Sequence, residues 1–221
     1  MSSDAPSTES RLRITEIFYS LQGESSFVGL PTVFVRLTGC PLRCGYCDTA
    51  YAFTGGEYLE MDEILQQVKQ HNAEYVCVTG GEPLAQRSCG ELLSSLCDAG
   101  YKVSIETSGA MDISQVDSRV KRIMDIKTPG SKEESKNRYE NIEILTSNDE
   151  VKFVLCSRTD YDWAKSIVEK YQLTEKCQVL FSPEHEGMKP SDLADWIIAD
   201  QLKVRFQFQI HKYLWDNEPG R

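Results

Sequence analysis

The sequence predicts an α/β fold, an incomplete (β/α) barrel with about six parallel strands. From residue 31 onward, short β-branched and apolar segments alternate with segments of helical periodicity. Polar or glycine-containing turns follow the apolar segments, and such turns carry the functional groups at the carboxyl ends of parallel strands. The 221 residues suit one domain but fall short of the roughly 250 residues of a complete eight-fold barrel.

The individual elements follow from the periodicity. Strands are expected over residues 31–37, 75–79, 102–106, 122–127, 150–155, 178–181 and 203–209. Helices are expected over residues 61–71, around 92–96, and over 161–171 and 191–200, where apolar residues recur every three or four positions. The polar run 129–141 predicts an exposed loop and a candidate lid.

The composition narrows the class of protein. Residues 1–12 begin with a polar stretch, so we expect a flexible N-terminal tail before a single domain over residues 13–221. The tail lacks the apolar core of a signal peptide, and no apolar stretch approaches the roughly 18 residues of a membrane-spanning helix. We therefore expect a cytoplasmic protein without a membrane partner. The formal charge of −10 argues against a nucleic-acid partner.

Three of the eight cysteines, Cys40, Cys44 and Cys47, lie close together in the sequence. Their C-x3-C-x2-C spacing lets three thiolates face one centre, and thiolates favour zinc or iron–sulfur clusters. Zinc usually takes four ligands, whereas three ligands on a four-iron cluster leave one iron open for chemistry. An incomplete zinc site and three unrelated core cysteines are the alternatives. The remaining cysteines are expected to be small buried apolar residues: Cys77, Cys89, Cys97, Cys156 and Cys177.

The cysteine loop and two later motifs resemble the radical S-adenosylmethionine (radical SAM) superfamily. An aromatic residue, Tyr46, precedes the last cysteine of the loop. Gly80-Gly-Glu-Pro83 resembles the superfamily's glycine-rich turn, whose backbone meets the methionine end of S-adenosylmethionine, and Glu106-Thr-Ser-Gly109 stands where a ribose-binding residue is common. The resemblance implies a [4Fe–4S] cluster on the three cysteines. Its open iron would bind S-adenosylmethionine, and its electron would release a 5′-deoxyadenosyl radical.

Further motifs resemble the 7-carboxy-7-deazaguanine synthase (QueE) family within this superfamily. They are Phe18–Glu24 (FYSLQGE), Gly29-x-Pro31, Arg36, Cys47-Asp-Thr49 and His211-Lys-Tyr213. The resemblance implies a carbon–nitrogen lyase that converts 6-carboxy-5,6,7,8-tetrahydropterin to 7-carboxy-7-deazaguanine with loss of ammonia, in queuosine and 7-deazapurine synthesis. It also implies Mg²⁺, a flavodoxin or ferredoxin as electron donor, and a homodimer.

The same resemblance assigns roles to single residues. It implies substrate contacts from Leu21, Gln22, Gly23, Glu24, Arg36, Thr79 and His211, and a magnesium contact from Thr49. It implies cofactor contacts from Tyr46, Cys47, Asp48, Gly81, Glu106, Asp125, Ile126, Lys127 and Ser182. The segment around Ser182 and the Asp125–Lys127 triplet differ in composition from parts of the family. Residues 214–221 extend past the point where some members end, so a terminal contact is not carried over.

Residue chemistry alone leaves some of these roles open. Gln22 and Glu24 can pair with the edge of an aminopyrimidinone or form a solvated turn. Arg36 lies inside an apolar strand and needs a carboxylate there, from either the substrate or a protein acid. A surface or structural place remains open for Lys127, Thr49 and His211, and is expected for His71 and His185.

Two other classes of protein compete with this interpretation. An activase that installs a glycyl radical on a partner protein would share the cysteine loop and the Gly80–Pro83 turn, without needing the LQGE segment or Arg36. A non-enzymatic iron–sulfur electron carrier would leave that turn unexplained. Cleavage of S-adenosylmethionine by the reduced protein distinguishes the enzymes from the carrier.

Overall fold

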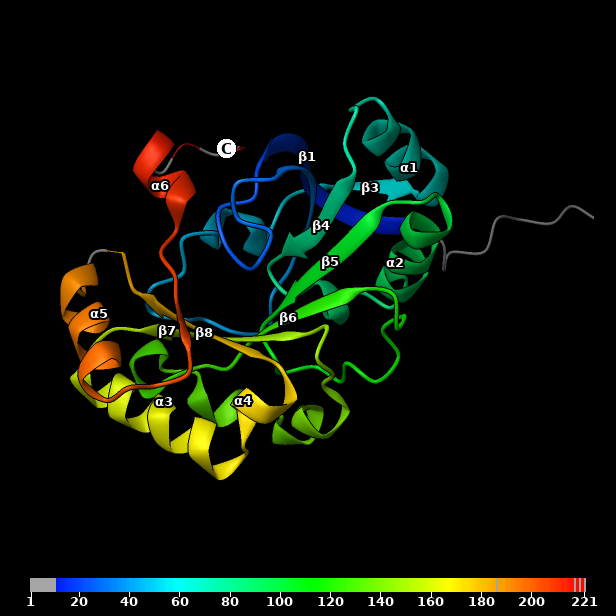
Figure 1. Cartoon of the computed structure of the whole chain (residues 1–221). Helices are drawn as coiled ribbons and strands as arrows, with labels where there is room; N and C mark the ends of the chain where they lie inside the picture. Colours follow the sequence, from blue (N-terminus) through cyan, green and yellow to red (C-terminus); the bar gives the residue numbers. More distant parts are fainter. Residues whose placement is uncertain (1–10, 186, 217, 219, 221) are drawn as a thin grey trace, which may run out of the picture.

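The computed structural model describes residues 11–185, 187–216, 218 and 220. Its centre is a nine-stranded sheet in the order β3-β1-β2-β4-β5-β6-β7-β8-β9. Strands β2 and β4 to β9 run parallel, whereas β1 is antiparallel to both of its neighbours. The sheet curves without closing, and helices α1 to α5 lie along its outer side (Figure 1). The predicted incomplete (β/α) barrel is therefore confirmed.

The elements have the following bounds. The strands are β1 (Arg11–Leu21), β2 (Pro31–Leu37), β3 (Glu57–Glu60), β4 (Tyr75–Gly80), β5 (Lys102–Thr107), β6 (Lys121–Asp125), β7 (Glu150–Leu155), β8 (Gln178–Pro183) and β9 (Arg205–Phe206). The helices are α1 (Met61–Lys69), α2 (Cys89–Asp98), α3 (Arg158–Lys170), α4 (Leu173–Lys176), α5 (Pro190–Ala199) and α6 (Ile210–Trp215). Short 3₁₀ turns are η1 (Ala50–Phe53), η2 (Pro83–Ala85), η3 (Pro129–Ser131), η4 (Glu134–Lys136) and η5 (Tyr139–Ile144).

The predicted parallel strands agree with the observed ones, and β2 and β7 have the expected bounds. The last predicted strand, over residues 203–209, is wrong. Only Arg205–Phe206 pairs with β8, and the chain then turns into α6. The boundary of the tail is also wrong. Strand β1 already includes Arg11 and Leu12, and Leu12 is fully buried. Residues 1–10 lie outside the described part of the chain.

Strands β1 and β2 form a hairpin with one irregularity that matters for the site. Ile14 lies opposite Leu37, but Glu16 lies opposite Arg36, so Thr15 is an extra residue on β1. Such a β-bulge changes which side chains share a face of the pair. The bulge places a carboxylate, rather than the Thr15 hydroxyl, directly across from the guanidinium of Arg36.

The loop between β1 and β2 crosses the inside of the curved sheet, where Figure 1 shows it in blue. Lys152 on β7 forms an ion pair with Glu24, with Nζ 2.6 Å from Oε2. Two residues later, the backbone N–H of Ser26 donates to both carboxylate oxygens of Glu150, at 3.1 and 3.2 Å. The loop therefore fills the interior and is anchored to a strand that lies far along the chain.

The polar run 129–141, all of it described, is not a lid, because none of its residues lines the cavity enclosed by the sheet. It folds into the 3₁₀ turns η3 and η4 and the start of η5, and buries Ser131 and Asn141. Asn137 exchanges two hydrogen bonds of 2.8 Å with the backbone of Lys127, and Gly45 donates to the carbonyl of Ser131. The run supports the cysteine loop from the side.

Other single-residue expectations are partly confirmed. Cys77, Cys89 and Cys177 are buried as predicted, whereas Cys97 and Cys156 are only half-buried. His71 is half-buried and stacks on Tyr19, with ring centroids 5.4 Å apart, so it is not the free surface residue that we expected.

A buried ion pair joins the start of β6 to the loop before β7. Arg122 donates from Nε and Nη2 to the two oxygens of Asp149, at 2.9 and 2.7 Å. Burial would raise the pKa of Asp149, but the Arg122 guanidinium and the Thr146 N–H hold the pKa below its ordinary value. The Asp149 carboxylate is thus charged, and the positive charge of Arg122 compensates for its burial.

We predict that Arg122→Ala lowers the free energy of unfolding of the chain by about 3 kcal/mol, because it leaves a buried carboxylate without its cation. The control is Arg119→Ala, which removes an arginine whose partners Asp98 and Asp117 lie at the surface. Urea denaturation of the cluster-free protein measures both. Equal effects of the two substitutions would contradict the prediction.

Candidate active site

One cavity of about 270 Å³ lies inside the curve of the sheet, at the carboxyl ends of the parallel strands. Seventeen of the nineteen predicted site residues line it, namely Leu21, Gln22, Gly23, Glu24, Arg36, Cys40, Cys44, Tyr46, Cys47, Asp48, Thr49, Thr79, Gly81, Glu106, Asp125, Lys127 and His211. The expectation that the ends of the parallel strands would meet in one pocket thus holds for Cys40, Thr79, Gly81, Glu106, Asp125 and Lys127.

The side chains of Ile126 and Ser182 do not line the cavity. Ile126 lies between Asp125 and Lys127 and belongs to the apolar core, because successive side chains of an extended segment point to opposite sides. Ser182 is buried within β8. The structure therefore places both side chains outside the cavity that the other candidates line.

The cysteine loop is held closely against the Gly80–Pro83 turn. The N–H of Gly81 donates to the carbonyl of Leu37 at 3.1 Å, and the N–H of Glu82 donates to the carbonyl of Gly39 at 2.8 Å. A Cβ atom on Gly81 would lie 2.2 Å from the Gly39 carbonyl oxygen and 2.7 Å from Cys40 Cβ. Only glycine allows this approach.

The three thiols are free, half-buried and lie on the wall of the same cavity. Burial raises the pKa of Cys40, and it raises that of Cys44 to about 11, so metal binding must displace the protons of these two thiols. Among the described residues, no three His, Cys, Asp or Glu side chains are arranged to hold a single metal ion. In a four-iron cluster each cysteine binds a different iron, so thiols distributed around one cavity fit a cluster.

Glu82 is a buried carboxylate that the sequence did not single out. It accepts hydrogen bonds from the Thr107 hydroxyl at 2.9 Å, from the Ser108 N–H at 2.7 Å and from the Ser108 hydroxyl. It also accepts from the N–H of Leu84 in its own turn. The carboxylate therefore fixes the glycine-rich turn to the end of β5.

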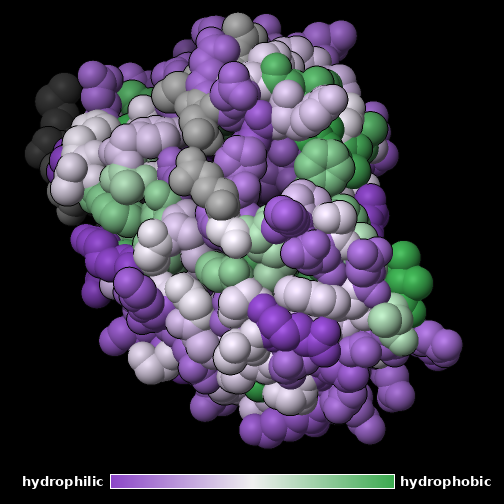
Figure 2. All heavy atoms as spheres, turned by 90° about the vertical axis from the view of Figure 1, so that its left-hand side faces the viewer, coloured by the Kyte–Doolittle hydropathy of each residue, from purple (hydrophilic) through white to green (hydrophobic). Residues whose placement is uncertain are grey.

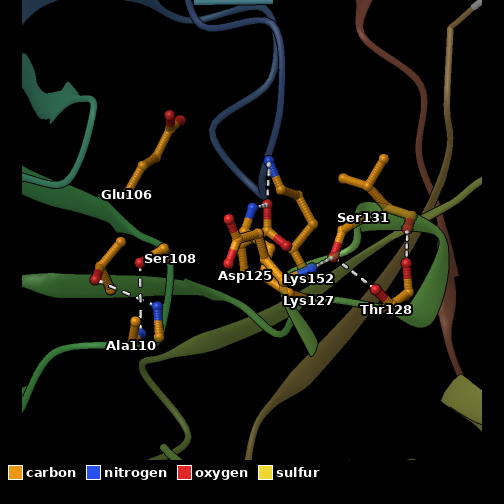
Figure 3. Close-up of polar contacts among 12 residues, drawn as sticks. Glu106, Ser108, Ala110, Asp125, Lys127, Thr128, Ser131 and Lys152 are labelled. Carbon is orange, nitrogen blue, oxygen red and sulfur yellow. Dashed lines mark hydrogen bonds and ion pairs between the residues drawn. The ribbon is translucent and has the colours of Figure 1, made fainter. Parts of the chain in front are cut away.

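Charged side chains from three parts of the chain meet on the floor of the cavity (Figure 3). Lys152 lies between Glu24 and Asp125, with Nζ 2.6 and 3.8 Å from their nearest oxygens, and Lys127 lies 2.9 Å from Asp125. Burial alone would raise the pKa of Glu24, but the Lys152 ammonium, with smaller contributions from His211 and the Gln209 hydrogen bond, lowers the pKa below its ordinary value. Burial would lower the pKa of Lys152, yet its carboxylate neighbours raise it well above the usual range. Both groups are charged.

Glu106 contacts two of the predicted substrate residues. The Thr79 hydroxyl donates to Oε2 at 3.0 Å, and Gln22 Nε2 donates to Oε1 at 3.4 Å. The resemblance assigned Glu106 to the cofactor. The structure instead places it in contact with residues assigned to the substrate.

The C-terminal helix α6 covers one side of the cavity. Gln209 donates to Glu24 Oε1 at 2.6 Å, and Lys212 forms an ion pair of 2.7 Å with Asp48. His211, which we expected at the end of a strand, lies on α6, and a Cβ atom on Gly23 would be only 1.9 Å from its Nδ1. Burial lowers the pKa of His211, which keeps the imidazole neutral.

The face of the molecule that carries α5 and α6 is largely hydrophilic, with small hydrophobic areas (Figure 2). Phe208, Tyr213 and Leu214 are exposed on the C-terminal segment, and Ile198 is exposed on α5.

Asp216, Glu218 and Gly220 from the extension beyond α6 also line the cavity. His185, expected at the surface, is exposed at the cavity wall.

Arg36 has a protein partner. Its Nε lies 2.6 Å from Glu16 Oε1, which is the structural ion pair that we weighed against a substrate contact. Thr49 lies beside the cluster loop, and its hydroxyl donates to Asp48 Oδ1 at 2.8 Å. Both residues line the cavity and can also face a ligand.

Sequence reasoning missed Lys152 and Gln209. In β7 the charged residues Glu150 and Lys152 occupy alternate positions of an otherwise apolar strand, and this pattern could have indicated that one face of the strand is polar. Gln209 has no comparable signal, because its partner Glu24 lies 185 positions earlier.

Comparisons with known proteins agree with this geometry. The sequence model of the Radical SAM superfamily matches residues 34–173. The crystal structure of QueE from Escherichia coli has a TM-score of 0.74 at 21% identity, covering 90% of this chain and 94% of that one. Streptococcus suis SuiB has a TM-score of 0.55 at 17% identity, covering 77% of this chain and 47% of that one. Fold and cysteine loop thus define a radical SAM protein, a class whose cofactors are a [4Fe–4S] cluster and S-adenosylmethionine.

Curated relatives narrow the class. A 7-carboxy-7-deazaguanine synthase of Chlorobaculum tepidum is 45% identical over 213 residues, covering 95% of this chain and 97% of the relative. Proteins of the same name from Koribacter versatilis and Thermoplasma acidophilum are 43% and 38% identical, each over 94% of this chain. The chain belongs to the 7-carboxy-7-deazaguanine synthase family.

We predict that Gly81→Ala reduces iron content several-fold after anaerobic reconstitution, because its methyl group would push the Gly39–Cys40 backbone away from the turn. Gly90→Ala is the control, since a Cβ atom there meets nothing within 4 Å. Iron and sulfide analysis, with the absorbance of the cluster, measures the effect. Full cluster loading of the Gly81 variant would show that the close approach is not required.

Proposed function

We propose that this protein forms 7-carboxy-7-deazaguanine from 6-carboxy-5,6,7,8-tetrahydropterin, with loss of ammonia, as a radical SAM lyase in 7-deazapurine synthesis. One observation carries the proposal. A single cavity is lined by the three cysteines and also by the polar residues of the LQGE segment, which suit an aminopyrimidinone. The names and the identity of the relatives support the same reaction.

On the cofactor side, Cys40, Cys44 and Cys47 would hold the cluster, which when bound supplies the electron that cleaves S-adenosylmethionine. Gly81 lines the cavity beside the cysteine loop, and its backbone would meet the methionine end. Asp125 Oδ1 and the Tyr46 hydroxyl are buried at the cavity and have no hydrogen-bond partner among the described residues. Because unpaired buried polar groups are costly, both atoms are suited to bind polar atoms of a ligand.

On the substrate side, Glu24 would accept hydrogen bonds from the N–H groups of the pterin. Lys152 and Gln209 each hold one of its oxygens, which fixes the carboxylate plane before a ligand arrives. Gln22 adds an amide with both donor and acceptor atoms. The neutral imidazole of His211 lies over Gly23, next to Glu24 in the chain.

Arg36 and Thr49 complete the substrate side. The Nη atoms of Arg36 are suited to the 6-carboxylate, because a guanidinium can bind a carboxylate through two parallel hydrogen bonds. Thr49 would offer its hydroxyl oxygen to Mg²⁺, which prefers oxygen ligands and retains several waters.

The two rival classes explain less of the cavity. An activase of a large protein substrate has no need for the LQGE side chains that point into a cavity of about 270 Å³. An electron carrier has no need for a glycine-rich turn that is fixed by the buried Glu82. The small-molecule enzyme accounts for both features.

The wider context of the enzyme is also part of the proposal. A flavodoxin or ferredoxin is the expected electron donor, the chain from Arg11 onward acts as one domain, and the protein is a cytoplasmic homodimer. These points rest on the family resemblance. No helix in the described part of the chain has the length and apolar character needed to cross a membrane.

We predict that the anaerobically reconstituted protein forms 7-carboxy-7-deazaguanine when it is given reductant, Mg²⁺, S-adenosylmethionine and 6-carboxytetrahydropterin. Mass spectrometry measures the product. Cys44→Ala should abolish product. Cys97→Ala, at a half-buried cysteine of α2 outside the cavity, should retain activity. Formation of 5′-deoxyadenosine without a deazapurine would refute the substrate while leaving the reaction class intact.

A second prediction concerns the charge of Glu24. In the wild type its lowered pKa keeps it ionised at neutral and mildly acidic pH. In Lys152→Met, burial acts without the cation and raises the pKa, so Glu24 takes up a proton as the pH falls. The kcat/KM of the variant should fall about tenfold more than that of the wild type between about pH 8.5 and pH 6. Lys165→Met, outside the cavity, is the control. Parallel pH profiles would contradict this role of Lys152.

A further inference from the structure

Glu16 is a charged residue of β1 that the proposed reaction does not use. It lies outside the cavity lining, yet its carboxylate contacts two residues that line it, Arg36 and Tyr51. Arg36 Nε donates to Glu16 Oε1 at 2.6 Å, and the Tyr51 hydroxyl donates to the same oxygen at 2.7 Å. The side chains of Arg36 and Glu16 are only 15% and 22% exposed, so bulk water screens this contact incompletely.

The backbone is arranged so that this contact forms. Without the bulge at Thr15, Arg36 would lie opposite Thr15, and Glu16 would point to the other face of the hairpin. With the bulge, Glu16 and Arg36 share a face with the next aromatic pair, Phe18 and Phe34, whose rings stack at 4.9 Å. A bulge that re-aims one side chain toward a functional site is a recurrent device in β-sheets.

The guanidinium is held on several sides. Its Cζ lies 5.6 Å from the centroid of the Phe18 ring and 5.9 Å from that of Tyr51, within the range of cation–π attraction. Glu16 accepts a hydrogen bond from Nε of Arg36. The two terminal nitrogens of the Arg36 guanidinium, Nη1 and Nη2, have no hydrogen bond to any residue that the structure describes. These two nitrogens are able to bind a carboxylate through two parallel hydrogen bonds.

We propose that Glu16 is a positioning residue that orients Arg36 to select substrates bearing a carboxylate, with Tyr51 fixing the Glu16 carboxylate. The proposal rests on the proposed function, because it takes the substrate carboxylate to bind Arg36. Glu16 itself does not touch the substrate. Its loss frees the Arg36 side chain, which must then be ordered again when the carboxylate binds.

The test compares two ligands that differ at one group, 6-carboxytetrahydropterin and 6-methyltetrahydropterin, with the cluster-loaded protein and S-adenosylmethionine. In Glu16→Ala we expect KM for the carboxylated substrate to rise about tenfold or more, with kcat changed less than about threefold. The Kd of the methyl analogue, measured by competition, should not change. Tyr51→Phe should show a smaller effect in the same direction.

Three further variants complete the test, and the first two guard against a trivial loss of structure. Glu16→Gln keeps an acceptor oxygen for Nε and should retain part of the selectivity. Glu57→Ala, at an exposed acid of β3 opposite Ile14, should leave both ligands unaffected. Arg36→Lys keeps the positive charge but lacks the two parallel N–H donors of a guanidinium. It should lose the selectivity for the carboxylated substrate, as Glu16→Ala does.

The outcomes separate this proposal from the proposed function. If the wild type forms no deazapurine from 6-carboxytetrahydropterin, the function itself fails. If the wild type is active but Glu16→Ala weakens both ligands equally, Glu16 only stabilises the pocket. If Glu16→Ala leaves KM unchanged, or lowers it because Arg36 gains net positive potential, the positioning role is overturned.

Discussion

The ion pair between Lys152 and Glu24 is the constraint on which the arrangement of the cavity depends. It joins β7 to the loop after β1, and the same ammonium lies 3.8 Å from Asp125 at the end of β6. Glu24 is proposed to contact the substrate and Asp125 the cofactor, and both are carboxylates inside one cavity. Without the cation they would repel each other or take up protons, because burial disfavours unpaired charge. One lysine therefore keeps two walls of the site close together.

Much of the fold and the centre of the site could be predicted because their signals are local. The parallel strands are short apolar runs between glycines and helical segments, and β2 and β7 were predicted with their observed bounds. The cysteine loop places its thiols within eight residues, and the Gly80–Pro83 turn follows the next parallel strand. Since strands of a parallel sheet all end at one edge, local motifs of this kind meet without any knowledge of distant contacts.

The remaining features depend on partners that are far apart in sequence. Lys152 and Glu24 are 128 positions apart, and Gln209 and Glu24 are 185 apart, so no periodicity connects them. Strand β1 escaped prediction because its residues from Thr15 to Leu21 are nearly all half-buried, which blurs the alternation of buried and exposed positions. Its bulge, which decides whether Thr15 or Glu16 faces Arg36, is a property of the hairpin pairing and not of either strand alone.

Many of the residues proposed for substrate recognition lie outside the part of the chain that the superfamily shares, although Arg36 and Thr79 lie within it. The superfamily match begins at Phe34 and ends at Leu173, and this range contains the cysteine loop, the glycine-rich turn, Asp125 and Lys127. The LQGE segment and Glu16 precede it, whereas Gln209 and His211 follow it. Besides the pairing of β1 with β2, polar side-chain contacts join the flanking pieces to the shared core, and Glu16 with Arg36 and Glu24 with Lys152 are two of them. Changes in those flanks can therefore alter which molecule is bound without disturbing the residues proposed to hold the cluster, and this is how one radical core can serve different substrates.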